Sequence, residues 1–172
     1  MGCANGYGRR GMNEKYLRIY LQDHLAGSTA GLELARRTRG ANEGRPEYGS
    51  PLAKIADEIE ADRRALQGIM EDLGFDGDRL KIAAAWGLEK VGRLKLNGEL
   101  TSYSPLSRMV ELEGLLSGIT GKKGLWLSLL QLVDDEPRLD RERLERLRDR
   151  AEDQRARVEA LRQQAARETF AG

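Results

Sequence analysis

The sequence predicts an all-α protein that folds as an antiparallel up-and-down bundle of about five helices. Apolar residues recur at alternating steps of three and four along most of the chain, which is the period of one helical face. Capping residues and glycines mark helix starts and ends between these runs. No run alternates apolar and polar residues in the manner of a half-buried strand.

The expected helix ends follow from capping chemistry. Asn13, Asp76 and Asp140 each precede an apolar-periodic run and can accept hydrogen bonds from the first turn, so they predict the starts of the first, third and fifth helices. Ser50-Pro51 and Ser104-Pro105 combine a cap with a first-turn proline and predict the starts of the second and fourth. The expected stops are Gly40, Gly74 and Asn97-Gly98.

Four of the predicted helices carry a stripe on one face that must be buried against neighbouring helices. The stripe residues are Leu17, Leu21, His24, Ser28, Gly31 and Ala35 in the first helix, Leu52, Ile55, Ile59, Asp62, Leu66, Ile69 and Leu73 in the second, Met109, Leu112, Leu116, Ile119, Lys123, Trp126 and Leu130 in the fourth, and Leu144, Leu147, Ala151, Gln154, Val158, Leu161 and Ala165 in the fifth. The faces opposite these stripes are expected to be solvated, above all in the charge-rich fifth helix.

Glycines recur inside two of the predicted helices. Gly27 and Gly31 lie four residues apart in the first, and Gly114, Gly118 and Gly121 follow one face of the fourth. A glycine inside a helix costs about 1 kcal/mol relative to alanine, so a compensating interaction is expected. Close packing within the chain is one explanation, and a self-association face used twice in a symmetric dimer is the other.

Composition limits the class of protein. The 172 residues suit a single domain, expected over 12–172, while the glycine-rich, polar residues 1–11 are expected to be a disordered extension. The 29 basic residues are balanced by 28 acidic ones, which argues against nucleic-acid binding. No apolar run reaches membrane-spanning length. The single cysteine, Cys3, rules out an internal disulfide and fits a cytoplasmic location.

Two polar residues on the predicted core stripes are the candidate site. A helical hairpin that pairs Ala35 with Ile55 places Ser28 opposite Asp62, with His24 one turn along. A buried carboxylate needs partners, so His24 and Asp62 are interpreted either as a polar pair or as metal or acid–base ligands. Glu113 and Glu58, which flank the stripes of their helices, are the further candidate metal ligands.

Long antiparallel helices with inward-facing acidic residues resemble the ferritin-like bundles, whose members often hold two irons between four helices. The resemblance covers most of residues 12–165 and concerns the architecture, a ferritin-like general shape. The motif of that family is Glu followed three residues later by His, whereas Leu21 occupies that position before His24. A di-iron centre of this pattern is therefore not expected. The run Asp23-His24-Leu25-Ala26-Gly27 also resembles helical proteins of bacteria with GC-rich genomes, from which no activity follows.

No catalytic motif is present. Gly118 to Lys123 contains a Gly-Lys pair, but it lacks the spacing of a phosphate-binding loop and the hydroxyl residue that follows the lysine. Whether the protein is an enzyme stays undecided. The leading hypothesis is a non-enzymatic bundle that acts through a protein partner or as a homodimer, without a cofactor. The alternative is a ferritin-like divalent-metal-binding or oxidoreductase protein, and a third is a small-molecule site near Trp86 and Trp126.

Overall fold

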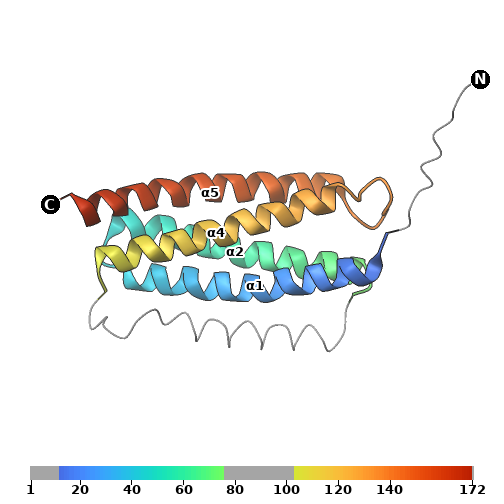
Figure 1. Cartoon of the computed structure of the whole chain (residues 1–172), viewed down its shortest axis with the longest axis horizontal. Helices are drawn as coiled ribbons and strands as arrows, with labels where there is room; N and C mark the ends of the chain where they lie inside the picture. Colours follow the sequence, from blue (N-terminus) through green and yellow to red (C-terminus); the bar gives the residue numbers. More distant parts are fainter. Residues whose placement is uncertain (1–11, 76–102, 172) are drawn as a thin grey trace, which may run out of the picture.

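The computed structural model describes residues 12–75 and 103–171 of the chain, and these residues form four helices and no strand. The helices are α1 (Glu14–Ala41), α2 (Pro46–Asp72), α4 (Pro105–Leu130) and α5 (Arg141–Phe170), and they lie side by side as a bundle (Figure 1). The all-α bundle predicted from the sequence is thus confirmed. The predicted third helix, from Asp76 to Asn97-Gly98, and the extension over 1–11 lie outside the described residues.

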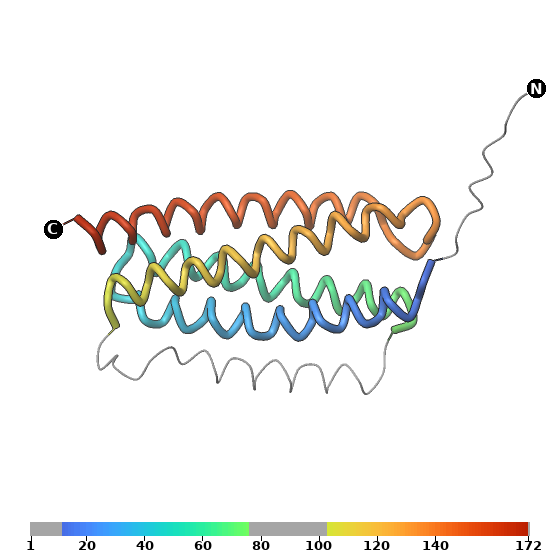
Figure 2. The backbone as a smooth tube through the Cα atoms, viewed as in Figure 1, coloured from blue at the N-terminus to red at the C-terminus, as the bar shows by residue number. Residues whose placement is uncertain are grey.

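Neighbouring helices of the bundle run antiparallel. The chain direction in Figure 2 shows that α1 and α2 form one hairpin and that α4 and α5 form the other. The two hairpins pack with α1 against α4 and, less closely, α2 against α5. Two diagonal pairs result, α1 with α5 and α2 with α4, whose backbones do not touch within the described part. Anything that joins α2 to α4 must therefore reach across the centre of the bundle.

Three of the predicted caps are confirmed in atomic detail. The side chains of Asn13, Ser104 and Asp140 each accept a hydrogen bond from the backbone N–H three residues later. Ser104 and Ser107 complete a reciprocal capping box at the start of α4. Gly74, beyond the end of α2, has a positive φ of 69°, which glycine adopts without strain. This conformation is the one expected of a glycine that ends a helix, so the predicted stop at Gly74 is confirmed.

The predicted start of the second helix is wrong. Pro46 occupies the first turn of α2, so the helix begins there, and Pro51 lies inside it instead of at its start. Pro46 gives the same first-turn signal as Pro51, five residues earlier. The loop before α2 folds back over Gly49, where an added Cβ would lie 2.9 Å from the carbonyl oxygen of Asn42. A glycine at position 49 permits this close approach.

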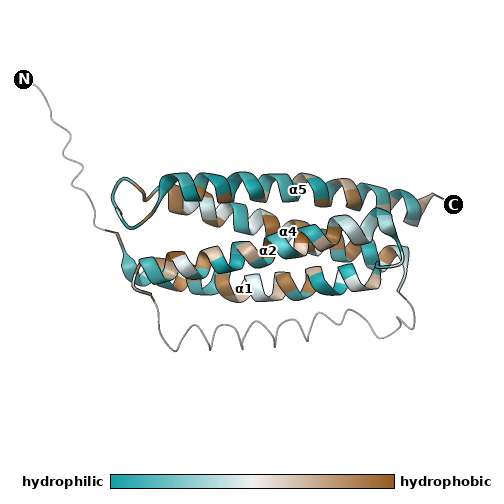
Figure 3. Cartoon of the chain, turned by 180° about the vertical axis from the view of Figure 1, so that it is seen from behind, coloured by the Kyte–Doolittle hydropathy of each residue, from teal (hydrophilic) through white to brown (hydrophobic). Residues whose placement is uncertain are grey.

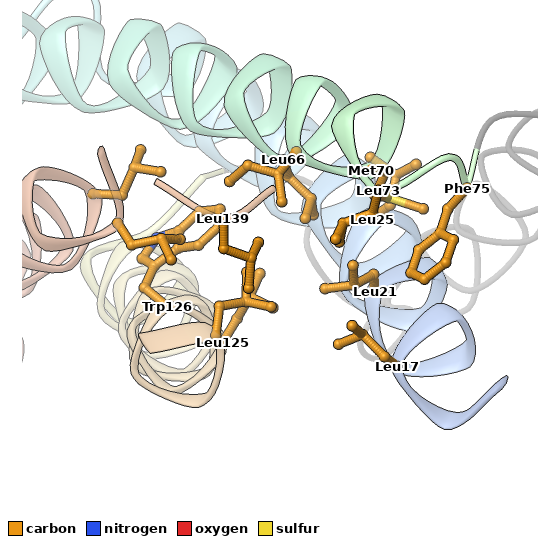
Figure 4. Close-up of a cluster of buried hydrophobic side chains, with 14 of the residues drawn as sticks. Leu17, Leu21, Leu25, Leu66, Met70, Leu73, Phe75, Leu125, Trp126 and Leu139 are labelled. Atoms are coloured by element: carbon orange, nitrogen blue, oxygen red, sulfur yellow. The ribbon is translucent and has the colours of Figure 1, made fainter. Parts of the chain in front are cut away.

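The core formed by the described residues consists of two hydrophobic clusters stacked along the bundle axis. The first, drawn in Figure 4, joins Leu21, Leu25, Leu66, Leu125 and Trp126 with residues of α5 and of the loop before it. The second is centred on Tyr48, Leu52, Ile55, Leu112, Leu115 and Val158. The two clusters share no residue, and the segment of the bundle between them carries the polar side chains described below.

The stripe predicted for α5 agrees with its buried residues position by position, and the rest of the helix is mostly hydrophilic (Figure 3). All seven stripe residues of α2 are likewise buried. The stripe predicted for α4 is partly wrong, because Leu115, Leu125 and Leu129 are buried where Leu116, Lys123 and Leu130 were expected. This helix is apolar or small-sided nearly all round, so its sequence defines the buried face poorly.

Candidate ligand-binding site

A polar layer crosses the middle of the bundle between the two hydrophobic clusters. Each described helix contributes to this layer: Ser28 from α1, Asp62 from α2, Lys122 from α4, and Arg150 and Gln154 from α5. Asp62 and Gln154 are almost fully buried, with 1% and 0% of their surface exposed. Burial of a carboxylate is unfavourable unless charged or hydrogen-bonding groups surround it, so the partners of Asp62 define this layer.

Asp62 accepts hydrogen bonds from three side chains of the described helices. Lys122 Nζ lies 2.5 Å from Asp62 Oδ2. Arg150 Nε donates to Asp62 Oδ1 at 2.7 Å, and its Nη2 contacts the same oxygen. Gln154 Nε2 donates to Oδ2 at 3.1 Å. One carboxylate thus faces two cations, which leaves this group of side chains with one net positive charge.

Lys122 lies at the edge of the polar layer. Its Nζ also donates to Gln154 Oε1 at 2.5 Å, and the side chain is 15% exposed. Burial lowers the pKa of Lys122 from the usual lysine value, and the carboxylate of Asp62 opposes that shift while Arg150 adds to it. An ammonium group has three N–H bonds, and two of them are used on Asp62 and Gln154.

A cavity of about 470 Å³ opens beside Lys122 between α1, α2 and α4, and five helix-interior glycines line it. These are Gly27 and Gly31 on α1 and Gly114, Gly118 and Gly121 on α4. An added Cβ at Gly27, Gly31, Gly118 or Gly121 would meet no atom within 4 Å. Only Gly114 is in tight contact, with Leu34. Among the described residues, four of the five glycines therefore create open space instead of close helix packing.

The remaining walls of this glycine cavity are mainly apolar, with a few polar side chains. The apolar wall residues are Ile59, Leu66, Leu115, Ile119, Leu125 and Trp126. The polar ones include His24, Ser28, Asp62, Arg63 and Lys122. Within the polar part, Ser28 Oγ already donates to the carbonyl oxygen of Leu25. Arg63 Nε is buried without a hydrogen-bond partner among the described residues. A small apolar pocket with convergent polar groups is the usual form of a small-molecule site.

His24 and Asp62 both line the glycine cavity, as does Ser28, but no hydrogen bond joins His24 to Asp62. The rings of His24 and Tyr20 instead pack in a T-shaped arrangement, with 4.5 Å between the ring centroids. Burial lowers the pKa of His24, and the neighbouring Asp23 carboxylate opposes the shift. The predicted placement of His24 within the core is also wrong, because Leu25 takes the buried position and His24 is half-buried at the cavity wall.

The four predicted metal ligands do not come together in the described part of the chain. Glu58 pairs with Arg157. Glu113 is half-exposed, and its nearest basic partner is Arg162 at 3.9 Å. The oxygens of Asp62 are occupied by cations, as described above. Across residues 12–75 and 103–171, no three His, Cys, Asp or Glu side chains are close enough together to hold a metal ion.

Sequence reasoning missed Lys122, Arg150 and Arg63. The predicted stripe of α4 includes Lys123 instead, and Lys123 pairs with Glu152 on the bundle surface. Two signals pointed to the polar layer: Asp62 and Gln154, each alone in an apolar stripe, required a buried partner. The glycine pattern of α4 marks the same level of the helix.

Comparison with protein-family models, with curated proteins and with solved structures found no match to this chain. The candidate site therefore rests on the geometry and chemistry of its own residues. Among the described helices, none has the length and apolar character needed to cross a membrane.

Proposed function

We propose that the protein binds a small, largely apolar molecule in the glycine cavity, and that this molecule carries one oxygen-containing acceptor group directed at Lys122. The observation that carries this proposal is the coincidence of the glycines with the polar layer. Within the described residues, four glycines leave space beside a partly buried lysine, although each lowers the stability of its helix by about 1 kcal/mol. Retaining several such glycines around one cavity is consistent with a need for the space itself.

The acceptor group follows from what the polar wall offers. The third N–H of Lys122 and the guanidinium of Arg63 are donors, and the hydroxyl hydrogen of Ser28 is already used within α1. Among the described residues at this wall, the three cations Lys122, Arg63 and Arg150 outnumber the two carboxylates Asp23 and Asp62. A carbonyl, carboxylate or hydroxyl oxygen therefore suits this wall, whereas an alkylammonium group would be repelled.

Dye displacement tests the proposal. Anilinonaphthalene sulfonate, whose fluorescence rises in apolar surroundings, is bound to the full chain and displaced with octanal, octanol, octanoate and octylamine. We expect the three oxygen-bearing compounds to compete and octylamine to compete at least ten-fold less well. Equal competition by all four, or by none, would contradict the proposal.

A matched pair of glycine variants locates the binding. Gly118→Leu adds a side chain inside the cavity, whereas Gly124→Leu adds one on the same helix outside it, and neither Cβ meets an atom within 4 Å. Octanoate affinity is expected to fall at least ten-fold in Gly118→Leu and to stay within two-fold in Gly124→Leu. Similar affinity in both variants would place the binding elsewhere.

Contact with another protein or a second copy of the chain, the leading hypothesis from the sequence, is the second candidate function. The supporting observation is the exposure of Leu106, Val110 and Leu127 on α4, at 50%, 38% and 41%. Leu106 and Val110 lie one helical turn apart, and exposed apolar side chains that adjoin in this way are typical of contact surfaces. Sedimentation velocity at high micromolar concentration tests self-association. A dimer that Val110→Glu dissociates would support it, and a monomer at every concentration would remove it.

A further inference from the structure

We propose that Lys122 forms a reversible imine with an aldehyde or ketone bound in the glycine cavity. This inference rests on the proposed function and names the ligand more narrowly, as a carbonyl compound with an apolar body. Lys122 is the one lysine among the described residues that line the cavity, and two acceptors from two other helices fix the position of its Nζ. A fixed amine beside an enclosed carbonyl has the arrangement that imine formation needs.

Within the described part of the chain, the hydrogen bonds of Lys122 leave one position on its nitrogen without a partner. In the neutral amine, two N–H bonds suffice for Asp62 Oδ2 and Gln154 Oε1. The third position, which a proton occupies in the ammonium form, then holds the lone pair. Because Lys122 lines the cavity and both acceptors lie in the polar layer, the nitrogen retains a site for attack on a bound carbonyl carbon.

Arg150 allows Lys122 to lose its proton without leaving Asp62 unpaired. If Lys122 were the only cation beside Asp62, loss of its proton would leave a buried, uncompensated carboxylate. Arg150 contacts Asp62 Oδ1 through both Nε and Nη2, so the carboxylate keeps a cation when Lys122 is neutral. Among the described residues, the charged groups that act on the pKa of Lys122 are Asp62 and Glu58 from α2 and Arg150 from α5. The other charged or titratable groups of the cavity wall are Asp23 and His24 from α1 and Arg63 from α2.

The atoms of the reaction balance without an oxidant or reductant. The amine nitrogen bonds to the carbonyl carbon as the carbon–oxygen π bond breaks, and the first amine hydrogen moves as a proton from nitrogen to that oxygen to give a carbinolamine. The hydroxyl group then leaves with the second amine hydrogen as water, and a carbon–nitrogen double bond forms. Asp62 contacts Lys122 and not the ligand. Its role is therefore to position the Lys122 amine and to set the pH at which that amine is neutral.

Reductive trapping on the full chain tests the inference. The protein is incubated with octanal and sodium cyanoborohydride near neutral pH, and the alkylated lysines are mapped by mass spectrometry. Lys123 is the internal control, since it follows Lys122 directly but pairs with Glu152 at the surface. We expect Lys122 to be alkylated at least ten-fold faster than Lys123 and the other lysines. Equal rates, or faster reaction at Lys123, would overturn the proposal.

Two variants connect the labelling to the cavity and to Asp62. Gly118→Leu is expected to slow alkylation of Lys122 at least ten-fold without changing that of Lys123. In Asp62→Asn the carboxylate that holds the proton on Lys122 is gone, so the midpoint of the pH profile for labelling should move to lower pH. A loss of structure alone would not shift this midpoint downward, and an unchanged midpoint would exclude the positioning role of Asp62.

The two proposals fail in distinguishable ways. If octanoate and octanol displace the dye but Lys122 is not preferentially alkylated, the cavity binds ligand without an imine, and this inference alone is wrong. If neither compound displaces the dye and Lys122 is unreactive, both proposals are wrong. If Lys122 is alkylated in Gly118→Leu at the wild-type rate, the lysine is reactive but the aldehyde does not reach it through the glycine cavity, and this inference is wrong.

Discussion

Lys122 Nζ and Asp62 Oδ2, 2.5 Å apart, join α4 to α2 across the centre of the bundle. These two helices lie diagonally, and no pair of their Cα atoms comes within 8 Å. The contact therefore depends on the length of the lysine side chain. It lies between the two hydrophobic clusters, which share no residue.

Removal of Asp62 is expected to destabilise the protein more than removal of Lys122. Asp62→Ala leaves Lys122 and Arg150 without their shared acceptor, and loss of one partner of a buried ion pair costs about 3–5 kcal/mol. Lys122→Met leaves Asp62 paired with Arg150 and should cost roughly half as much. Urea denaturation at pH 7 measures both free energies of unfolding. Equal losses would mean that Arg150 contributes little to holding Asp62.

The sequence was sufficient wherever one helix carried its own signal. The N-caps Asn13, Ser104 and Asp140 act on their own first turns, so local chemistry determines them. The stripe of α5 was equally clear, because charged residues surround it on the other faces. The start of α2 was missed since Pro46 and Ser50-Pro51 give competing signals of the same kind.

The site was only half visible for a physical reason. Asp62 was identified as needing a partner, and the register of the first hairpin suggested His24. The actual partners come from α4 and α5, and their approach depends on how the two hairpins pack. No local pattern encodes that packing. A uniformly apolar helix such as α4 also hides its buried face, which is why Lys123 was assigned to the core instead of Lys122.

Glu136 is expected to contribute to the free energy of unfolding in a way that is lost in acid. Its carboxylate accepts two hydrogen bonds at 2.7 Å from the guanidinium of Arg138, and this pairing lowers the pKa of Glu136 from 4.5 to about 2. A carboxyl group whose pKa is lower in the folded than in the unfolded state stabilises the fold at pH values above its unfolded-state pKa. This stabilisation is lost as the pH falls through the folded-state pKa. The stability difference between wild type and Glu136→Gln should therefore be complete above pH 4.5 and shrink toward pH 2.

Chemical denaturation at a series of pH values checks this prediction. Arg138 Nη1 also donates to the carbonyl oxygen of Leu73 at the end of α2, so the variant should loosen that helix end as well. Glu142→Gln, which breaks a pair between two well-exposed side chains, is the control and should change stability by less than about 0.5 kcal/mol at pH 7. A Glu136→Gln difference that persists at pH 2 would contradict the assignment.

Arg108 is expected to stabilise one end of the bundle through a buried network. Its guanidinium carbon lies 4.4 Å from the ring centroid of Tyr48, and it donates to Asn42 at 2.6 Å and to Glu168 at 2.8 Å. Arg108→Met removes both charge-assisted hydrogen bonds and should cost about 2–4 kcal/mol. Arg108→Lys should not restore the stability, because an ammonium lacks the planar fork that reaches both acceptors.

Thermal and urea unfolding of the two Arg108 variants provide the measurement. Arg36→Ala removes a half-exposed arginine whose partners are also at the surface, and its effect should stay within about 0.5 kcal/mol. If Arg108→Lys unfolds like the wild type, the network would depend on charge alone and not on the geometry of the guanidinium group.

Alanine substitutions should sort the helix-interior glycines by what surrounds them. At Gly124 and Gly118 an added Cβ meets nothing within 4 Å, so alanine should raise the free energy of unfolding by up to about 1 kcal/mol. At Gly49 the Cβ would lie 2.9 Å from the backbone oxygen of Asn42, so alanine should lower it. Urea denaturation of the three variants gives these signs, and a gain at Gly49 would contradict the close approach.

The same series separates stability from binding. Gly124→Ala lies outside the cavity and should change only stability, whereas Gly118→Ala should gain stability and lose some octanoate affinity. A glycine that lowers stability and raises affinity is kept for the space it leaves, since alanine would be the better helix residue at that position. If Gly118→Ala gained stability and bound octanoate as well as the wild type, the space beside Lys122 would have no role in binding.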